Sequence, residues 1–333
     1  MIKPLDTDFS KHQYDKTAVS MLSDYFNINV AIVGGKSQLS QIQWFENLSL
    51  LAQQNLGLAH CVVHNQTARG AIDITCHNGG SASLVRPYAN HVGAFSFAKG
   101  HDLSIRLNGQ RLVGKKTLAS GLHNSDYFVF RVFDKDERRR WVFLDLTQVE
   151  HKINRHYAGL IGLQIANPYD MTIDAEIPAE WILDEYATSK QLRSVLGFHN
   201  YALITNYWAA SRSLIAIIKN QAQRKNHNLC YGLLKLENQV SMLELLWKKN
   251  ISSIFEPRWD VEFWKYRSTQ YTFGKQTLID VISYYLQIAN SSSLQLDQNS
   301  QVFRDCLTFS SHITSLYSNL EHPERFESGQ CAE

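Results

Sequence analysis

The sequence predicts a mainly helical α+β chain in three parts: an N-terminal helical domain, a central β domain and a C-terminal four-helix bundle. The spacing of apolar residues is helical in the first part, changes to short alternating runs, and becomes helical again. With 333 residues, of which 44% are hydrophobic, the chain is long enough to bury a large core. We expect the three parts at residues 1–90, 91–185 and 186–325.

The first part is predicted from the stretch "SQLSQIQWFENLSLLAQQNLGLAHCVVHNQTARGAI" (37–72). Its apolar residues recur at near-helical spacing: Leu48, Leu51, Leu56, Ala59, Val62 and Val63. Gly57 is the expected weak point, because glycine destabilises a helix interior. The segment "IVGGK" (32–36) predicts a break before this helix.

The β domain is predicted from short apolar or alternating runs that turn sequences separate. The runs are "GAFSFAK" (93–99), "LSIRLNG" (103–109), "YFVFRVF" (127–133) and "RWVFLDL" (140–146). The turns contain "KGHD", "NG" and "DKDE". A further stretch of the same type ends at Leu183. Because no helices separate these strands, we expect an antiparallel barrel or sandwich.

The bundle begins with "SVLGFHNYALITNYWAASRSLIAIIKN" (194–220), which is apolar on most faces and therefore predicted to be buried. A second helix carries a seam of Leu233, Leu236, Val240, Leu243 and Trp247. A third covers about 260–289. The last has an apolar stripe of Val302, Cys306, Phe309, Ile313, Leu316 and Leu320. Beside it runs a polar stripe of Gln301, Asp305, Thr308, His312, Ser315 and Asn319.

Composition excludes several classes of function. The formal net charge is +2, so neither nucleic acid nor a membrane surface is an expected partner. No stretch approaches the ~20 apolar residues of a membrane span, and the first residues lack the apolar core of a signal sequence. The five cysteines show no metal-ligand spacing. We therefore expect no metal site, reduced thiols and a cytoplasmic location.

The order of the three parts, with three stretches in sequence, resembles the acyl-CoA dehydrogenase superfamily. These stretches are "QNLGLAHCVVHNQTARGAI" (54–72), "LNGQRLVGKKTLASGLHNSDYFVFRV" (107–132) and "SSSLQLDQNSQVFRD" (291–305). The resemblance implies FAD between the β domain and the bundle, and a substrate that is an acyl-CoA or another small molecule. It also implies a homo-oligomer, a dimer or tetramer, because the apolar seam from Leu233 to Trp247 suits packing between bundles.

The resemblance carries over to four candidate cofactor-binding residues. Ser96 matches a position on the first strand that supplies hydroxyls and amides to the flavin. Leu118 and Ser120 fall where the family's second strand ends at the flavin ring, and Ser120 keeps a hydroxyl there. Arg224 is the nearest match to the arginine that binds the pyrophosphate. Ser96 and Ser120 also fit plain strand serines, and Arg224 also fits a surface arginine.

The last helix carries the catalytic candidate. Counting from Arg304 and Asp305, the position of the family's catalytic glutamate is Ile313, which cannot be a base. The neighbouring His312 resembles a histidine in the flavin monooxygenases of the same fold, where histidine and serine steady or protonate a flavin–oxygen adduct. His312 also fits a bundle-seam residue bonded to Asp305 or Thr308. The same resemblance implies that His60, His64 and His123 lie in stretches that face the active-site cleft of the family. Each of these histidines also fits an ordinary polar position in a helix or turn.

Three functions therefore follow from the sequence. The first is an FAD-dependent oxidoreductase of acyl-CoA dehydrogenase type, acting on an acyl thioester or a similar small molecule. The second is a non-catalytic dehydrogenase paralogue that serves as a binding or assembly partner. The third is a flavin-dependent monooxygenase.

Overall fold

The structure is a computed structural model of the whole chain. It describes residues 3–12, 15–26, 38–77, 92–96, 105–155, 168–224, 231–250, 261–291 and 301–310.

Three helices precede the sheet: α1 (Lys16–Phe26), α2 (Gln38–Gln54) and α3 (Leu56–His77). The long helix expected over this region breaks at Asn55, two residues before Gly57. The Asn55 side chain explains the break, because its Oδ1 accepts a hydrogen bond from the Leu58 N–H (3.1 Å), which caps α3. Its Nδ2 donates to the carbonyl oxygens of Phe9 and His12, both at 3.0 Å. One asparagine therefore starts α3 and holds the N-terminal segment.

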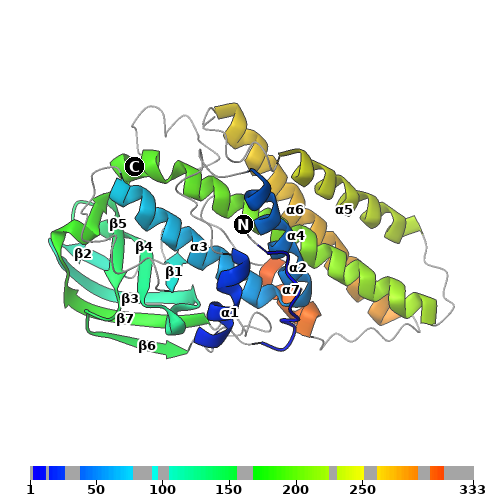
Figure 1. Cartoon of the computed structure of the whole chain (residues 1–333), viewed down its shortest axis with the longest axis horizontal. Coiled ribbons are helices and arrows are strands. Elements are labelled where there is room, and N and C mark those ends of the chain that lie inside the picture. Colours follow the sequence, from blue (N-terminus) through cyan, green and yellow to red (C-terminus); the bar gives the residue numbers. More distant parts are fainter. Residues whose placement is uncertain are drawn as a thin grey trace.

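The central part is an eight-stranded sheet (Figure 1). Its strands are β1 (Gly93–Ser96), β2 (Arg106–Asn108), β3 (Arg111–Ser120), β4 (Tyr127–Asp134), β5 (Arg139–Asp145), β6 (His151–Arg155), β7 (Pro168–Glu176) and β8 (Ile182–Asp184). The strand order is β6-β7-β3-β2-β4-β5-β8, with β1 paired to β4. The sheet is mixed, because β1 and β2 both run parallel to β4 while the other pairs are antiparallel.

Four helices follow: α4 (Glu185–Arg224), α5 (Tyr231–Asn250), α6 (Val261–Ser291) and α7 (Gln301–Ser310). Figure 1 shows α3 and α4 running from the sheet into the helical half of the molecule, while α5 lies at the outside of the bundle. Both long helices also contact strands: α3 packs on β1, and α4 packs on β5 and β8. The predicted order of helices, sheet and bundle is confirmed, whereas the domain boundaries themselves stay a prediction.

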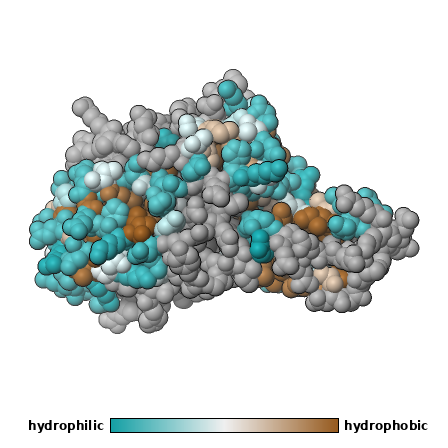
Figure 2. Space-filling model, turned by 90° about the horizontal axis from the view of Figure 1, so that it is seen from below, coloured by the Kyte–Doolittle hydropathy of each residue, from teal (hydrophilic) through white to brown (hydrophobic). Residues whose placement is uncertain are grey.

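Aromatic side chains join the helices into one core. Trp44 of α2 packs on Phe198 of α4 with ring centroids 4.7 Å apart, and its indole N–H donates to the Phe26 carbonyl of α1 (3.1 Å). Farther along α4, the Trp208 ring stacks on Trp247 of α5 at 5.2 Å. The surface is more mixed: on the face shown in Figure 2, hydrophilic residues at the sheet end surround smaller hydrophobic patches. Among the described helices, none has a stretch long and apolar enough to span a membrane.

The apolar seam of α5 corrects one step of the reasoning from sequence. The five seam residues are all buried within the subunit: Leu233, Leu236, Val240, Leu243 and Trp247. They pack in the bundle, against helices such as α4 and α6, and are not a surface that a second chain could cover. A separate set of exposed apolar residues follows the outer side of α5: Tyr231, Leu234, Met242 and Leu245.

The Gly93→Ala variant tests how tightly β1 is packed. A Cβ atom at residue 93 would lie 2.4 Å from two ring atoms of Tyr127, which is buried and has little room to move. We expect a loss of about 1–3 kcal/mol in the free energy of unfolding, measured by urea denaturation. Gly274→Ala is the control, because its nearest neighbour is 3.5 Å away and alanine favours a helix. Equal stability of the two variants would contradict close packing at Gly93.

Candidate functional site

The structure describes two of the five predicted site residues completely. Ser96 ends β1 and Ser120 ends β3, and both side chains are half-buried. Leu118 lies in β3, where the pairing with β7 shifts register between Lys116 and Ala119, and Arg224 is the last residue of α4. The side chains of Leu118 and Arg224, and His312 as a whole, lie outside the described part of the chain.

Strand β1 is fixed along both of its edges. On the edge toward β4, the Val92 carbonyl accepts a hydrogen bond from the Asp126 N–H at 2.7 Å. On the opposite edge, two backbone groups face α3: the Gly93 N–H donates to Asn65 Oδ1 (2.8 Å), and the Phe95 carbonyl is 2.6 Å from His64 Nδ1. Since residues two apart in a strand point to the same side, both contacts lie on one edge. Side chains of α3 therefore bond the edge of β1 that no described strand pairs with.

Three histidines meet beside this edge. His60 and His64 lie one turn apart on α3 with ring centroids 4.4 Å apart, and His199 of α4 lies 5.4 Å from His64. All three side chains are buried. The sheet and the last helix complete the surroundings, because Phe95 packs on His199 (5.7 Å) and Phe309 of α7 packs on His60 (5.7 Å).

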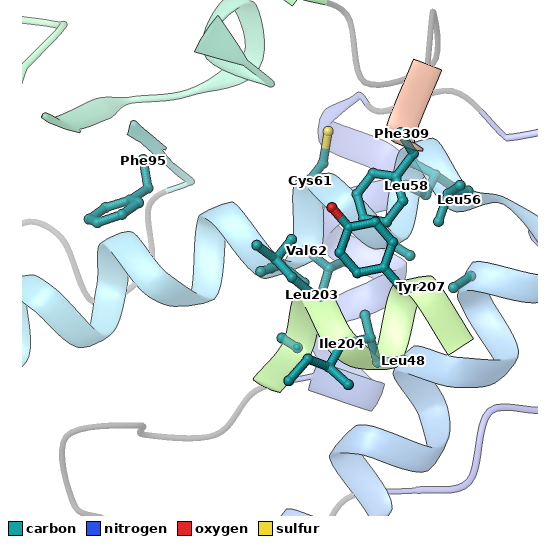
Figure 3. Close-up of a cluster of buried hydrophobic side chains, with 14 of the residues drawn as sticks. Leu48, Leu56, Leu58, Cys61, Val62, Phe95, Leu203, Ile204, Tyr207 and Phe309 are labelled. Carbon is teal, nitrogen blue, oxygen red and sulfur yellow. The ribbon is translucent and has the colours of Figure 1, made fainter. Parts of the chain in front are cut away.

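Apolar residues surround the histidines. Figure 3 shows Tyr207 of α4 and Phe309 of α7 side by side, with Cys61 of α3 close to them, while Phe95 lies apart from them on the sheet side. The centroids of the Tyr207 and Phe309 rings are 4.6 Å apart. The imidazoles are thus in a low-dielectric environment, where a charge is costly.

The hydrogen bonds define where the ring protons are. A carbonyl oxygen only accepts, so His64 carries its proton on Nδ1 and donates it to Phe95. The single hydroxyl proton of Thr67 is donated to the Val63 carbonyl at 2.6 Å. His199 Nδ1, 2.9 Å from the same hydroxyl, must then be the donor to Thr67. His64 and His199 are therefore each held in one tautomer by a partner on or beside α3.

The charge state of His64 follows from its burial. Burial lowers the pKa of the His64 imidazole from its usual value of 6.5 to about 4, although the hydrogen bond to the Phe95 carbonyl raises it. At neutral pH His64 is a neutral ring with a donor at Nδ1 and a lone pair at Nε2. It can accept a hydrogen bond there, but as a neutral ring it cannot pair with an anion.

Sequence reasoning found part of this site. It named His60 and His64, which the structure brings together, and His123, which lies elsewhere and stacks on Tyr169 (4.8 Å). It missed His199 and Asn65. His199 stands in the apolar stretch "LGFHNYALI", where a lone histidine is the available signal, whereas nothing in the sequence marks Asn65 as the partner of β1.

The described residues fit a flavin edge in part. Flavin rings need hydrogen-bond donors at their carbonyl and nitrogen edge. The hydroxyls of Ser96 and Ser120 make no hydrogen bond within the described part of the chain, and both stand at strand ends, where β1 and β3 are in contact. Two donors are therefore available. No group of histidine, cysteine, aspartate and glutamate among the described residues could hold a metal ion.

Helices α1–α3, a sheet that packs on α3 and α4, and a following helical bundle together define the acyl-CoA dehydrogenase fold. The comparison of solved structures shows the same. A glutaryl-coenzyme A dehydrogenase in its glutaryl-CoA complex has a TM-score of 0.71 and 14% identity, covering 95% of this chain and 89% of that one. The fold resemblance expected from the sequence is thereby confirmed.

Two further structures represent two kinds of flavoprotein. A Mycobacterium smegmatis glutaryl-CoA dehydrogenase in complex with FADH2 matches with a TM-score of 0.64 and 11% identity, covering 94% of this chain and 87% of that one. The dibenzothiophene monooxygenase TdsC of Paenibacillus sp. A11-2, in its complex with FMN and indole, matches with a TM-score of 0.68 and 12% identity, covering 91% of this chain and 88% of that one. No protein-family model and no curated protein matches the sequence.

The lowered pKa of His64 predicts a pH dependence of stability. Between about pH 4 and 6.5 the unfolded chain binds a proton at residue 64 that the folded chain does not, so His64 makes stability fall as pH falls through this window. The full effect is on the order of 3 kcal/mol. We expect the pH slope of the free energy of unfolding to be shallower in His64→Asn. His60 and His199 remain in both proteins and cancel in the comparison, and an unchanged slope would contradict the assignment.

Proposed function

We propose that the chain is a flavin-binding oxidoreductase that prefers FAD and acts on an acyl thioester or a similar small molecule. The observation that carries this proposal is the fold, shared over 95% of the chain with a glutaryl-CoA dehydrogenase. Similar structures carry FADH2 or FMN, which favours a flavin as the cofactor. The bound flavin would supply the transfer of hydride or electrons, which no amino-acid side chain provides.

The chain's own residues would bind and orient the flavin. Ser96 and Ser120 would donate hydrogen bonds to its edge from the ends of β1 and β3. Leu118 would lie against the ring as an aliphatic surface, and Arg224, at the end of α4, would face the pyrophosphate. His64 and Asn65 hold β1, and with it Ser96, in a fixed place relative to α3.

A flavin monooxygenase is the first alternative. Ile313 stands where the dehydrogenases have their glutamate, and three imidazoles lie buried between α3 and α4. Imidazoles suit the protonation of a bound oxygen species better than the removal of a proton beside a thioester. The similarity to the monooxygenase TdsC agrees with this alternative.

A non-catalytic paralogue is the second alternative. The first strand is not followed by the family's glycine-serine-aspartate loop, and Arg224 lacks the phenylalanine-glycine that normally comes after it. Such a protein would keep the fold as a binding or assembly partner of a dehydrogenase. The composition and the free thiols Cys61 and Cys306 suit the reducing cytoplasm that we infer for each of the three functions.

We also infer a homo-oligomer that forms through the outer side of α5. Tyr231, Leu234, Met242 and Leu245 are 82%, 55%, 57% and 68% exposed. Their spacing of 3, 8 and 3 residues places them within one helical face. An apolar stripe of this kind outside a bundle suits isologous contact with the same helix of a second copy.

Flavin uptake tests the leading proposal. The protein should bind added FAD, with the visible absorption of an oxidised flavin that remains after gel filtration. Ser96→Ala and Ser120→Ala should each weaken FAD binding roughly three- to tenfold, the worth of one neutral hydrogen bond. Ser283→Ala is the control, because this exposed α6 hydroxyl bonds within its own helix. A protein that takes up no FAD or FMN would leave the paralogue as the better reading.

His312→Ala tests the catalytic candidate in the flavin-loaded protein. If His312 supplies acid–base chemistry, the variant should turn over ~100-fold more slowly, with flavin content and melting temperature nearly unchanged. Stopped-flow reoxidation of the chemically reduced protein by oxygen gives a rate that needs no known substrate. A stability loss of about 1–3 kcal/mol with an unchanged rate would instead make His312 a structural residue of the bundle.

Leu245→Glu tests the oligomer. A charged residue in the centre of an apolar contact should dissociate the assembly, so light scattering at micromolar concentration should change from dimer or tetramer to monomer. Lys152→Glu, at an exposed position of strand β6, is the control for the change of charge. A wild-type protein that is already monomeric would contradict the interface.

A further inference from the structure

Among the residues that the structure describes, several buried side chains of α3 and α4 carry polar atoms without hydrogen-bond partners. Three of them are His64, through Nε2, and Asn200 and Asn206, each through both amide atoms. His64 is 8% exposed, and the two asparagines are 2% and 0% exposed. A buried polar group that lacks a partner costs about 1–3 kcal/mol, so three of them in one region require an explanation.

These groups belong to the same two helices as the histidine cluster. His64 faces His199, and Asn200 is the next residue along α4. Asn206 follows His199 by seven residues, almost two complete turns, and therefore lies on the same side of α4 as His199. α3 packs against α4, and His64 and His199 lie at this contact.

The hydrogen bonding of His64 determines which kind of ligand could bind to it. Its Nδ1 proton is already donated to the Phe95 carbonyl, and its Nε2 is therefore an acceptor without a donor. The rings of His60 and His199 both pack edge-on against it. A ligand for this position needs one hydrogen-bond donor on an aromatic or otherwise apolar body.

We propose that His64 Nε2 is a ligand-binding acceptor between α3, α4 and β1, where it receives a hydrogen bond from a neutral hydroxyl or N–H group on an apolar small molecule. The amides of Asn200 and Asn206 extend the polar lining along α4. The oxygen atoms of an acyl thioester only accept hydrogen bonds, so they do not suit this acceptor. The site therefore selects donor-bearing ligands such as phenols or N–H heterocycles.

This inference rests on the proposed function only in calling the ligand a substrate, because binding at His64 needs no flavin. It narrows the substrate of the proposed oxidoreductase from an acyl thioester or a similar small molecule to a small molecule with a hydroxyl or N–H donor. A ligand held at this place would also lie beside the carbonyl that precedes Ser96, so the substrate and the proposed flavin edge would share strand β1.

Phenol and toluene are the probes, because they have nearly the same size and differ in one hydrogen-bond donor. We expect calorimetric titration of the full-length protein without flavin to show phenol binding roughly three- to tenfold more tightly than toluene. In protein labelled with ¹⁵N-histidine, the Nε2 resonance of His64 should shift on addition of phenol and not of toluene. Equal affinities, or no binding of either probe, would overturn the proposal.

Two variants separate the acceptor from the contact to β1. In His64→Asn the amide N–H can still reach the Phe95 carbonyl while the acceptor is gone, so stability should stay near that of the wild type and the preference for phenol should vanish. In His64→Gln an amide oxygen replaces Nε2, so the preference should remain while stability falls. If His64→Asn still preferred phenol, the phenol hydroxyl would be bonding to another residue, and His64 Nε2 would not be the acceptor.

The flavin experiments are independent of these. If the protein binds FAD but shows no preference for phenol, this inference fails alone. If it prefers phenol but takes up no flavin, the ligand site stands and the oxidoreductase proposal fails.

Discussion

The attachment of α3 to strand β1 is the constraint on which the rest of the site depends. β1 has four residues and, among the described strands, pairs with β4 alone, so its other edge needs hydrogen-bond partners from elsewhere. His64 and Asn65 bond that edge from α3, at the Phe95 carbonyl and the Gly93 N–H. This contact joins the N-terminal helices to the sheet and fixes the position of Ser96.

Phe95 extends the contact to the rest of the molecule. Its ring stacks on Trp141 of β5 at 5.7 Å and packs on His199 of α4 at the same distance. One residue of a short strand therefore touches the sheet, the N-terminal helices through its carbonyl, and the bundle through its ring. If the sheet, the N-terminal helices and the bundle shifted relative to one another, the histidine cluster and the end of β1 would be displaced together.

The histidine cluster gives this fold a neutral polar centre. Burial keeps His64 uncharged at neutral pH, and fixed tautomers make its two nitrogens unequal, one a donor that holds β1 and the other an acceptor. Such a centre suits the recognition of a hydroxyl or N–H group. It does not suit the pairing of an anion, which distinguishes it from a site built on a charged histidine or arginine.

The sequence by itself determined the element order, because helical and alternating periods report directly which residues of a segment face the core. It also pointed to His60 and His64, and to serines that the structure places at the strand ends. Only the tertiary structure decided that His199 meets His64 across 135 residues of chain, that Asn65 bonds β1, and that the α5 seam is internal. These depend on which helix packs on which strand, and periodicity identifies a buried face without identifying what covers it.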